Sequence, residues 1–135
     1  MDRLFLDANV LFTAAHNPGG KAAFLFDHLG ARRWKLISSR FAIEEARRNI
    51  VAKCPQHEER LVQLLERVSE AAQPAPRATP IDLPAKDQPI WLAALAAEAT
   101  HLLTGDLKHF GPHMNKPETT GGVVIQTVAD YLAGL

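Results

Sequence analysis

The sequence predicts an α/β fold in which helices pack around a mainly parallel β-sheet. Short apolar runs of strand length, such as residues 4–6 and 123–125, alternate along the chain with longer segments whose apolar residues recur at helical spacing. The strand-like runs are apolar at successive positions, as strands covered on both faces require. With 135 residues, 47% of them apolar, the chain is long enough for one packed domain and too short for two. We therefore expect a single domain over residues 1–135.

The first elements are a strand and two helices. Residues 3–7 (RLFLD) contain the run Leu4, Phe5 and Leu6, which is apolar on both faces and too short for a helix, and this favours a short buried strand. Asn9 is a candidate cap for a helix over residues 10–15. The Asn-Pro-Gly-Gly cluster at 17–20 then breaks the chain before a second helix with apolar positions between residues 22 and 29.

A strand and a helix pair are expected next. Residues 34–38 (WKLIS) are the strand candidate, and Ser39 can cap a helix over residues 40–53 that carries an apolar stripe. Pro55 starts a further helix, whose apolar residues recur at helical spacing from Leu61 to Val68. These two helices are expected to pair as a hairpin.

The last part of the chain repeats the alternation after a proline-rich loop over residues 73–84. Either Asp87 or Gln88 opens the next helix. The expected elements are, in order, a helix over 89–99, a strand over 100–104, a loop over 111–122, a strand over 123–125 and a helix over 127–135.

Composition excludes several classes of protein. No window approaches the length of an apolar membrane span, and the first residues run directly into a strand, so we expect a cytoplasmic protein without a membrane partner. The one cysteine, Cys54, cannot form an intramolecular disulfide or a thiolate zinc site. The net charge of zero differs from that of most proteins that coat nucleic acid, although an acidic pocket can offset basic residues elsewhere.

Four carboxylates are placed to form a site. Active sites of open parallel sheets lie at the carboxyl ends of the strands. Asp7 ends one strand and Asp106 follows another after a single glycine, whereas Asp87 begins a helix and Glu45 lies one to two turns into another. We expect all four side chains to reach one crevice.

Each carboxylate also has a structural interpretation. Asp87 before Gln88-Pro89 could serve as a helix cap, and Asp106 could be a turn residue. Asp7 closes an apolar strand, where a buried carboxylate needs a partner or an ion. Glu44 has Arg47 and Arg48 at the spacing of a solvated ion pair, so Glu45 is favoured as the ligand and Glu44 is the alternative.

A carboxylate cluster is tolerable when divalent cations supply the opposing charge. The histidines show no ligand spacing, and oxygen donors alone select Mg²⁺ or Mn²⁺ over zinc. Such ions make water nucleophilic near neutral pH and neutralise charge on a phosphate, which suits phosphodiester hydrolysis.

Several motifs, in order, resemble those of the PIN-domain family of nucleases. They are FLDANVL at 5–11, the serine-started helix SRFAIEEARRNI at 39–50 with its acid six residues after the serine, KDQPI followed by LAALAA at 86–97, LTGD at 103–106, and VIQT through YL at 124–132. The resemblance covers nearly the whole chain and is nearest to VapC-like ribonucleases, which are toxins of toxin–antitoxin pairs.

This resemblance implies a three-layer α/β/α sandwich with a mainly parallel central sheet, and an endoribonuclease that uses one or two Mg²⁺ or Mn²⁺ ions. The metal ligands would be Asp7, Glu45, Asp87 and Asp106, while Asn9 and Thr104 would orient ligands by hydrogen bonding. It also implies an RNA substrate, a small antitoxin protein as partner and a homodimer. His109 departs from the family, which often has an acid there, and this leaves the number of metal ions open.

Basic residues supply candidate phosphate contacts. Lys108, two residues after Asp106, is expected near the pocket, and Arg40 and Arg48 are further candidates, although charge runs are usually solvated surfaces. Two other functions remain open. One is a catalytically weak PIN fold that binds RNA or protein. The other, a phosphatase with Asp7 as nucleophile, lacks its second acid because Asn9 occupies that place.

Overall fold

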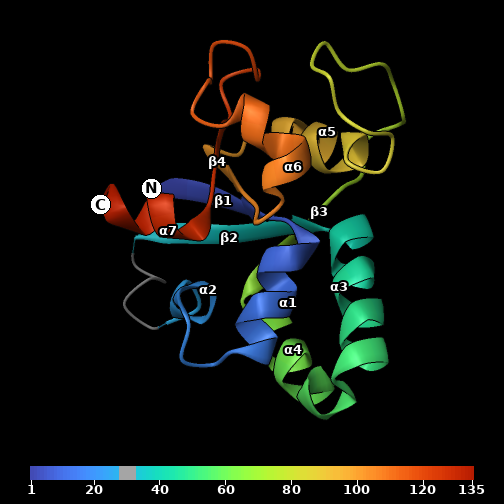
Figure 1. Cartoon of the computed structure of the whole chain (residues 1–135), viewed down its shortest axis with the longest axis vertical. Helices are drawn as coiled ribbons and strands as arrows, with labels where there is room; N and C mark the ends of the chain where they lie inside the picture. Colours follow the sequence, from blue (N-terminus) through green and yellow to red (C-terminus); the bar gives the residue numbers. More distant parts are fainter. Residues whose placement is uncertain (28–32) are drawn as a thin grey trace.

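A five-stranded sheet forms the centre of the structure, a computed structural model that describes residues 1–27 and 33–135 (Figure 1). All of its strand pairs are parallel, and the strand order is β3-β2-β1-β4-β5. The strands are β1 (Asp2–Leu6), β2 (Trp34–Ser39), β3 (Val68–Ala71), β4 (His101–Leu103) and β5 (Val124–Gln126). Leu4, Phe5 and Leu6 of the central strand are fully buried, as expected for a strand covered on both faces.

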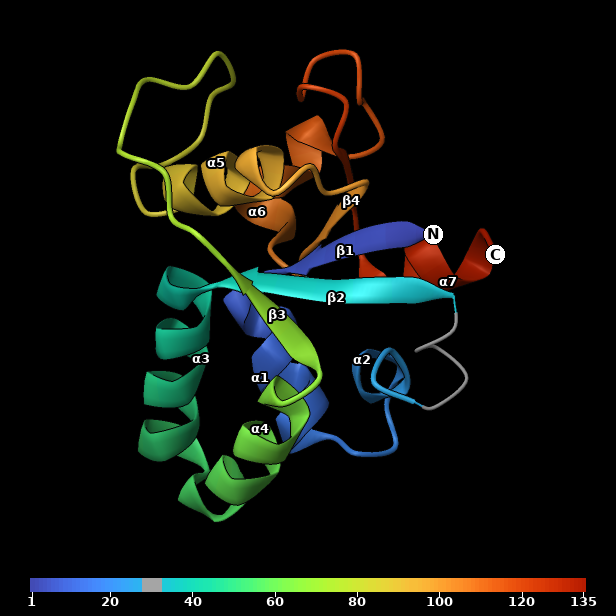
Figure 2. The same cartoon turned by 180° about the vertical axis from the view of Figure 1, so that it is seen from behind.

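Helices cover both faces of this sheet (Figures 1 and 2). One face carries α1 (Ala8–His16), α2 (Lys21–Phe24), α3 (Arg40–Lys53) and α4 (Glu58–Leu65), the last preceded by the 3-10 helix η2 (Pro55–His57). The other face carries α5 (Gln88–Ala96) and α6 (Leu107–Phe110), followed by the 3-10 helix η3 (Gly111–His113). The last helix, α7 (Val128–Ala133), contacts α2. The expected α/β/α sandwich is confirmed, and its described strands are all parallel.

The order of the strands determines where a site can form. From β1 the chain crosses to β2 and β3 on one side, and it later returns to place β4 and β5 on the other side of β1. Beyond the carboxyl ends of β1 and β4 the two departing chain segments diverge, which is the usual location of a ligand site in such sheets. The register pairs Leu6 with Leu103, so Asp7 and Thr104 follow these strands side by side.

Most predicted elements are present with shifted ends. The strand expected at 34–38 extends to Ser39, whose hydroxyl caps α3 as predicted by accepting a hydrogen bond from the Ala42 amide at 3.2 Å. Helix α5 ends at Ala96 instead of residue 99. The predicted second helix is present as α2, and residues 28 and 29 of that prediction lie outside the described residues.

Two short elements were not predicted. Val68, assigned to the helix that begins near Pro55, instead starts β3, which pairs with β2 at the edge of the described sheet. Two of its four residues, Ser69 and Glu70, are polar and exposed, as an edge strand that is only partly covered allows. Helix α6 has four residues, which are too few to show the apolar periodicity by which a helix is recognised in a sequence.

Among the residues that the structure describes, no helix combines the length and the apolar character needed to cross a bilayer.

Candidate metal centre

A cavity of about 330 Å³ lies at the carboxyl ends of β1 and β4. It collects side chains from the ends of both strands, from α3 and from the start of α5. The lining residues are Asp7, Asn9, Glu45, Lys86, Asp87, Ile90, Gly105, Asp106 and His109. The structure therefore brings together all four predicted carboxylates.

Asp7 is the most enclosed of these acids, with a side chain only 4% exposed. Its Oδ1 accepts a hydrogen bond from the Ala8 amide at 2.7 Å, which makes Asp7 the cap of α1. Its Oδ2 accepts from the hydroxyl of Thr104 at 2.8 Å. Burial raises the pKa of Asp7 to about 6; these hydrogen bonds oppose that increase, and the charges of Glu45 and Asp87 add to it. A cation beside Asp7 would offset the cost of its charge.

Asn9 and Thr104 hold Asp7 in place. The prediction that Asn9 caps α1 is wrong, because Asp7 occupies that position. The Asn9 amide Nδ2 donates instead to Asp7 Oδ2 and to Thr104 Oγ1, both at 3.2 Å, and its Oδ1 accepts from the Gly105 amide at 2.7 Å. Thr104 Oγ1 also accepts from the Asp106 amide at 3.1 Å. This network ties the end of β1 to the loop after β4 and positions two of the acids.

Asp87 occupies the N-cap position of α5, as its alternative interpretation predicted, but its side chain makes no capping hydrogen bond. Its Oδ2 is buried and has no hydrogen bond of good geometry within the described part of the chain, although His109 Nδ1 lies 3.0 Å away. Burial raises the pKa of Asp87, the nearby charge of Asp106 adds to the increase, and His109 and Lys86 oppose it. A buried carboxylate oxygen without a partner is costly, and a cation is the partner that the surrounding acids would accept.

Asp106 caps a short helix and also lines the cavity. Its Oδ1 accepts from the His109 amide at 3.1 Å and so caps α6, while its Oδ2 lies 2.8 Å from His109 Nδ1. The side chain of Asp106 still lines the cavity. The local turn therefore accounts for one oxygen, and the other faces the site.

The side chains of the two neighbouring glutamates of α3 point in different directions. Glu45 is half-buried and lines the cavity, where its charge raises the pKa of both Asp7 and Asp87. Glu44 points elsewhere and forms an exposed ion pair with Arg40, with Nε and Oε1 3.1 Å apart. Its predicted pairing with Arg47 and Arg48 is thus replaced by a contact one turn earlier. Glu45 is the glutamate that reaches the acids.

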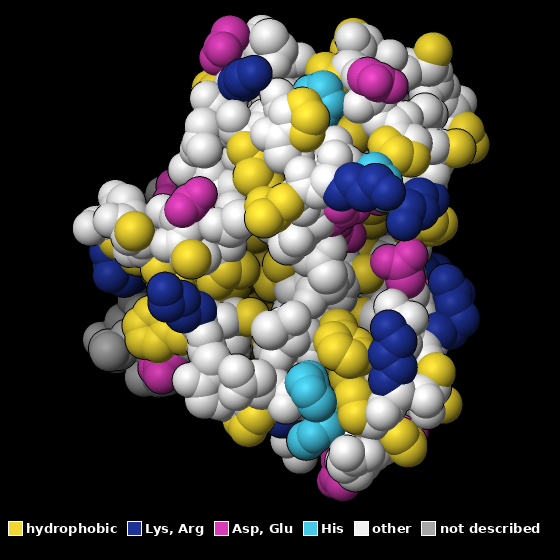
Figure 3. Space-filling model, in the orientation of Figure 1, with side chains coloured by type: hydrophobic (Ala, Val, Ile, Leu, Met, Phe, Trp, Pro, Cys, Tyr) yellow, Lys and Arg dark blue, Asp and Glu magenta, His cyan; other side chains and the backbone are white. Residues whose placement is uncertain are grey.

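The basic residues are arranged differently from the prediction. Lys108 is exposed and is not among the residues that line the cavity, whereas Lys86 is. Lys86 directly precedes Asp87, and its position next to a predicted ligand is the sequence feature that could have indicated Lys86 as a cavity residue. Arg40 is engaged with Glu44, and Arg48 is exposed on α3. Figure 3 shows Lys and Arg side chains beside acidic ones over the region between α3 and α6.

His109 is not in the predicted ligand set, yet it belongs to a group of described residues that could hold a cation. One ligand atom each from Asp87, Asp106 and His109 can be chosen so that all three lie within 4.8 Å of one another. Residues three apart share a helix side, so α6 presents His109 toward the carboxylate that caps it. Spacing along the sequence gave no sign that His109 lies beside Asp87, because the two residues are distant in the chain.

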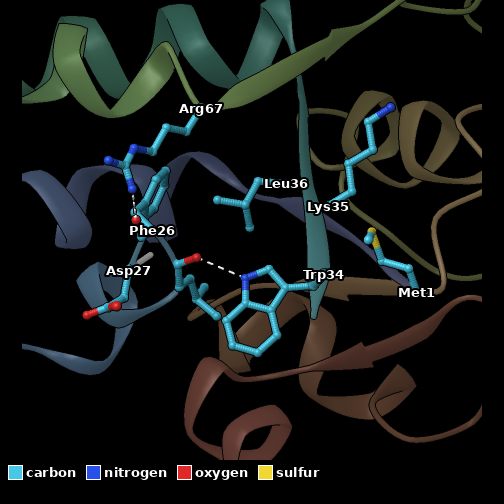
Figure 4. A pocket seen from close by; sticks show the side chains of 8 residues that line it. Met1, Phe26, Asp27, Trp34, Lys35, Leu36 and Arg67 are labelled. Atoms are coloured by element: carbon cyan, nitrogen blue, oxygen red, sulfur yellow. Dashed lines mark hydrogen bonds between the residues drawn. The ribbon is translucent and has the colours of Figure 1, made fainter. Parts of the chain in front are cut away.

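A second cavity, of about 350 Å³, lies at the opposite ends of the strands (Figure 4). Its lining includes Trp34, whose indole Nε1 donates to the Leu25 carbonyl at 2.9 Å, and Arg67, which donates to the Phe26 carbonyl. In both hydrogen bonds a side-chain donor is already occupied by a backbone carbonyl. Among the described residues that line it, Asp27 is the one acid, so this part of the cavity wall lacks the clustered carboxylates of the first.

The metal-free protein is expected to lose stability as the pH rises from 4 to 7. Because burial raises the pKa of Asp7 to about 6 from 3.8, the folded state binds a proton more tightly than the unfolded chain between these values. The corresponding stabilisation is present below pH 4 and is lost as the pH passes 6, a change of about 3 kcal/mol at most. Asp87, whose pKa is also raised, acts in the same direction.

Urea unfolding in the presence of a chelator can measure this contribution, with Asp7→Asn as the reference. The difference in unfolding free energy between parent and variant should change with pH in favour of the variant on going from pH 4 to 7. A difference that stays constant over this range would show that the charge of Asp7 is not penalised in the fold.

Comparisons with known proteins agree with this fold. A family model described as "PIN domain" matches residues 3–108. The VapBC2 structure from Rickettsia felis, bound to a DNA fragment from their promoter, has a TM-score of 0.66 at 15% identity, over 93% of this chain and 98% of that chain. VapBC-1 from nontypeable Haemophilus influenzae has a TM-score of 0.58 at 17% identity, over 94% and 98%.

VapC20 from Mycobacterium tuberculosis, described as a toxin that cleaves the sarcin–ricin loop, has a TM-score of 0.55 at 13% identity, over 82% of this chain and 94% of that chain. At these identities the likeness concerns the fold. No curated protein sequence matches the chain significantly.

Proposed function

This chain belongs to the PIN-domain family, and from that premise we propose that it is a Mg²⁺- or Mn²⁺-dependent endoribonuclease, the toxin of a toxin–antitoxin pair. The observation that carries the proposal is the convergence of four carboxylates on one cavity, one of them with a buried oxygen that lacks a hydrogen bond. A protein gains nothing in stability from such an arrangement, because like charges repel and burial adds to the cost. The arrangement is useful if a divalent cation binds there.

In this proposal Asp7, Glu45, Asp87 and Asp106 hold one or two ions. When bound, a divalent cation activates water for attack on a phosphodiester and neutralises the charge that develops on the phosphate. Thr104 and Asn9 keep the Asp7 carboxylate oriented through their hydrogen bonds to its Oδ2. Lys86, at the cavity wall, can approach a phosphate oxygen of the substrate.

The similarity in fold to known toxins supports the proposed RNA substrate and the proposed antitoxin partner. Two of the similar structures are VapBC structures, and a third is a toxin that cleaves the sarcin–ricin loop. We therefore propose RNA as the substrate and a small antitoxin protein as the partner. Lys108, Arg40 and Arg48 remain candidates for contacts with RNA outside the cavity.

Neighbouring glutamates of α3 provide a matched test of the site. Glu45→Gln is expected to lower the rate of cleavage of defined RNAs about 10²-fold, because it removes one charged ligand while keeping the side-chain shape. Glu44→Gln, one position earlier, should change the rate less than about twofold, because Glu44 forms only an exposed ion pair.

The same assay tests metal dependence. Cleavage should require added Mg²⁺ or Mn²⁺ and stop when a chelator is present. Equal rates for the two glutamine variants, or cleavage that persists without metal, would contradict the proposed mechanism.

One observation favours the second candidate function, a catalytically weak PIN fold that binds RNA or protein. His109 lies at the cavity where an acid is common in the family. This alternative predicts RNA binding without metal-dependent cleavage, and it predicts that Asp7→Asn leaves the affinity for RNA unchanged.

A further inference from the structure

The imidazole of His109 lies between two carboxylates that it cannot satisfy at once. Its Nδ1 is 2.8 Å from Asp106 Oδ2 and 3.0 Å from Asp87 Oδ2. A ring nitrogen carries at most one hydrogen, which here makes a hydrogen bond of good geometry to Asp106. Asp87 Oδ2 is thereby left buried and without a hydrogen bond. With a proton on Nδ1, one of the two carboxylates therefore has no hydrogen-bond donor for its buried oxygen.

A cation in place of that proton would satisfy all three side chains. Ligands that occupy adjacent corners of an octahedron, at bond lengths of about 2.1 Å, are separated by about 3 Å. The two distances from His109 Nδ1 to the carboxylate oxygens have this size. Ligand atoms of all three side chains lie within 4.8 Å of one another, so a small adjustment of the two carboxylates would bring them onto one ion.

Local structure keeps the imidazole at this position. The Asp106 carboxylate caps α6 by accepting from the His109 backbone amide at 3.1 Å, and the same side chain faces the His109 ring. The backbone and the ring of His109 are thus both fixed relative to Asp106. His109 is half-buried, which limits the number of other positions open to the ring.

We propose that His109 is a nitrogen ligand of the metal centre and that it shifts the preference of the centre from Mg²⁺ to Mn²⁺. This inference rests on the metal centre proposed above and specifies its selectivity. Mg²⁺ is bound in proteins almost entirely by oxygen, whereas imidazole nitrogen suits first-row transition metals. An Asp-Asp-His donor set therefore penalises Mg²⁺ relative to Mn²⁺, and an acid at position 109 would remove this penalty.

Electron paramagnetic resonance of bound Mn²⁺ tests the nitrogen ligand directly. The parent protein loaded with Mn²⁺ should show coupling between the metal electron spin and a ¹⁴N nucleus. The coupling should be absent from His109→Asp and present in His113→Ala, whose replaced imidazole contacts the Asp82 carbonyl and does not line the cavity. Absence of ¹⁴N coupling in the parent would overturn the inference, and this measurement needs no variant to fold.

Calorimetric titration of the metal-free proteins with Mn²⁺ and with Mg²⁺ tests the selectivity. The ratio of Mn²⁺ to Mg²⁺ affinity should fall about tenfold or more in His109→Asp and stay unchanged in His113→Ala. An unchanged ratio in His109→Asp would overturn the inference.

These measurements separate the inference from the proposed nuclease function. Nitrogen-coordinated Mn²⁺ in a protein that cleaves no RNA would leave the inference standing and refute the function. Metal-dependent cleavage with Mn²⁺ bound by oxygen alone would refute the inference and leave the function standing.

Discussion

Asp7→Asn is expected to lower the rate of RNA cleavage by about 10³-fold, equivalent to about 4 kcal/mol of transition-state stabilisation. The substitution replaces a charged oxygen with an amide that donates hydrogen bonds, in a side chain that is only 4% exposed and has little freedom to move away. Its Oδ2 accepts from Thr104 and Asn9, so an amide nitrogen at this place would face other donors. The loss should be larger than that for Glu45→Gln, because Glu45 is less enclosed.

The effect can be measured with defined RNAs in Mn²⁺ or Mg²⁺ and, in cells, by growth after expression. We expect the parent to arrest growth, a small protein encoded beside it to relieve the arrest, and Asp7→Asn to be harmless. Asp82→Asn is the matched control, because Asp82 is exposed and does not line the cavity. Cleavage by Asp7→Asn at the parental rate, or harmless expression of the parent in its own host, would refute the proposed role.

Phe5→Ala is expected to destabilise the protein by about 3–5 kcal/mol, a large part of the stability of a domain of this size. Phe5 is fully buried in the central strand, where it pairs with Ile37 of β2 and Leu102 of β4. Helices cover both faces of the sheet, so the lost ring would leave a cavity that the surrounding elements can fill only in part. The change in the midpoint of urea unfolding measures the effect.

An exposed phenylalanine provides the comparison. Phe24 of α2 is 43% exposed, and Phe24→Ala should cost about 1 kcal/mol or less. If Phe5→Ala does not fold, Phe5→Leu keeps most of the volume and should lose about 1–2 kcal/mol. Equal effects at positions 5 and 24 would contradict the central position of β1.

Sequence patterns were sufficient for the layers of the fold and for two of the acids. Apolar strand runs alternating with helical periodicity determined the α/β architecture, because those patterns record which residues are covered by neighbouring elements. Asp7 and Asp106 could be identified as candidates because Asp7 directly follows β1, Asp106 comes shortly after β4, and parallel strands end at the same edge of a sheet. The order of the motifs along the chain predicted the family that the family model also identifies.

Other features depended on contacts between segments distant in the sequence. Glu44 and Glu45 differ by one position on α3, and only the rotation of that helix against the core directs Glu45 to the cavity. Strand β3 lies at the edge of the described sheet, and its two apolar residues, Val68 and Ala71, are too few to distinguish it from the preceding helix.

Asp87 and His109 show most clearly what the sequence determined and what only the tertiary structure decided. For Asp87 the sequence suggested both a helix cap and a metal ligand, and for His109 it suggested no ligand role. Packing of the start of α5 against α6 instead brings His109 Nδ1 to 3.0 Å from an Asp87 oxygen that has no hydrogen bond. Spacing along a chain describes neighbours within one helix or strand, whereas the cost of burying an unpaired charge arises only where separate elements meet.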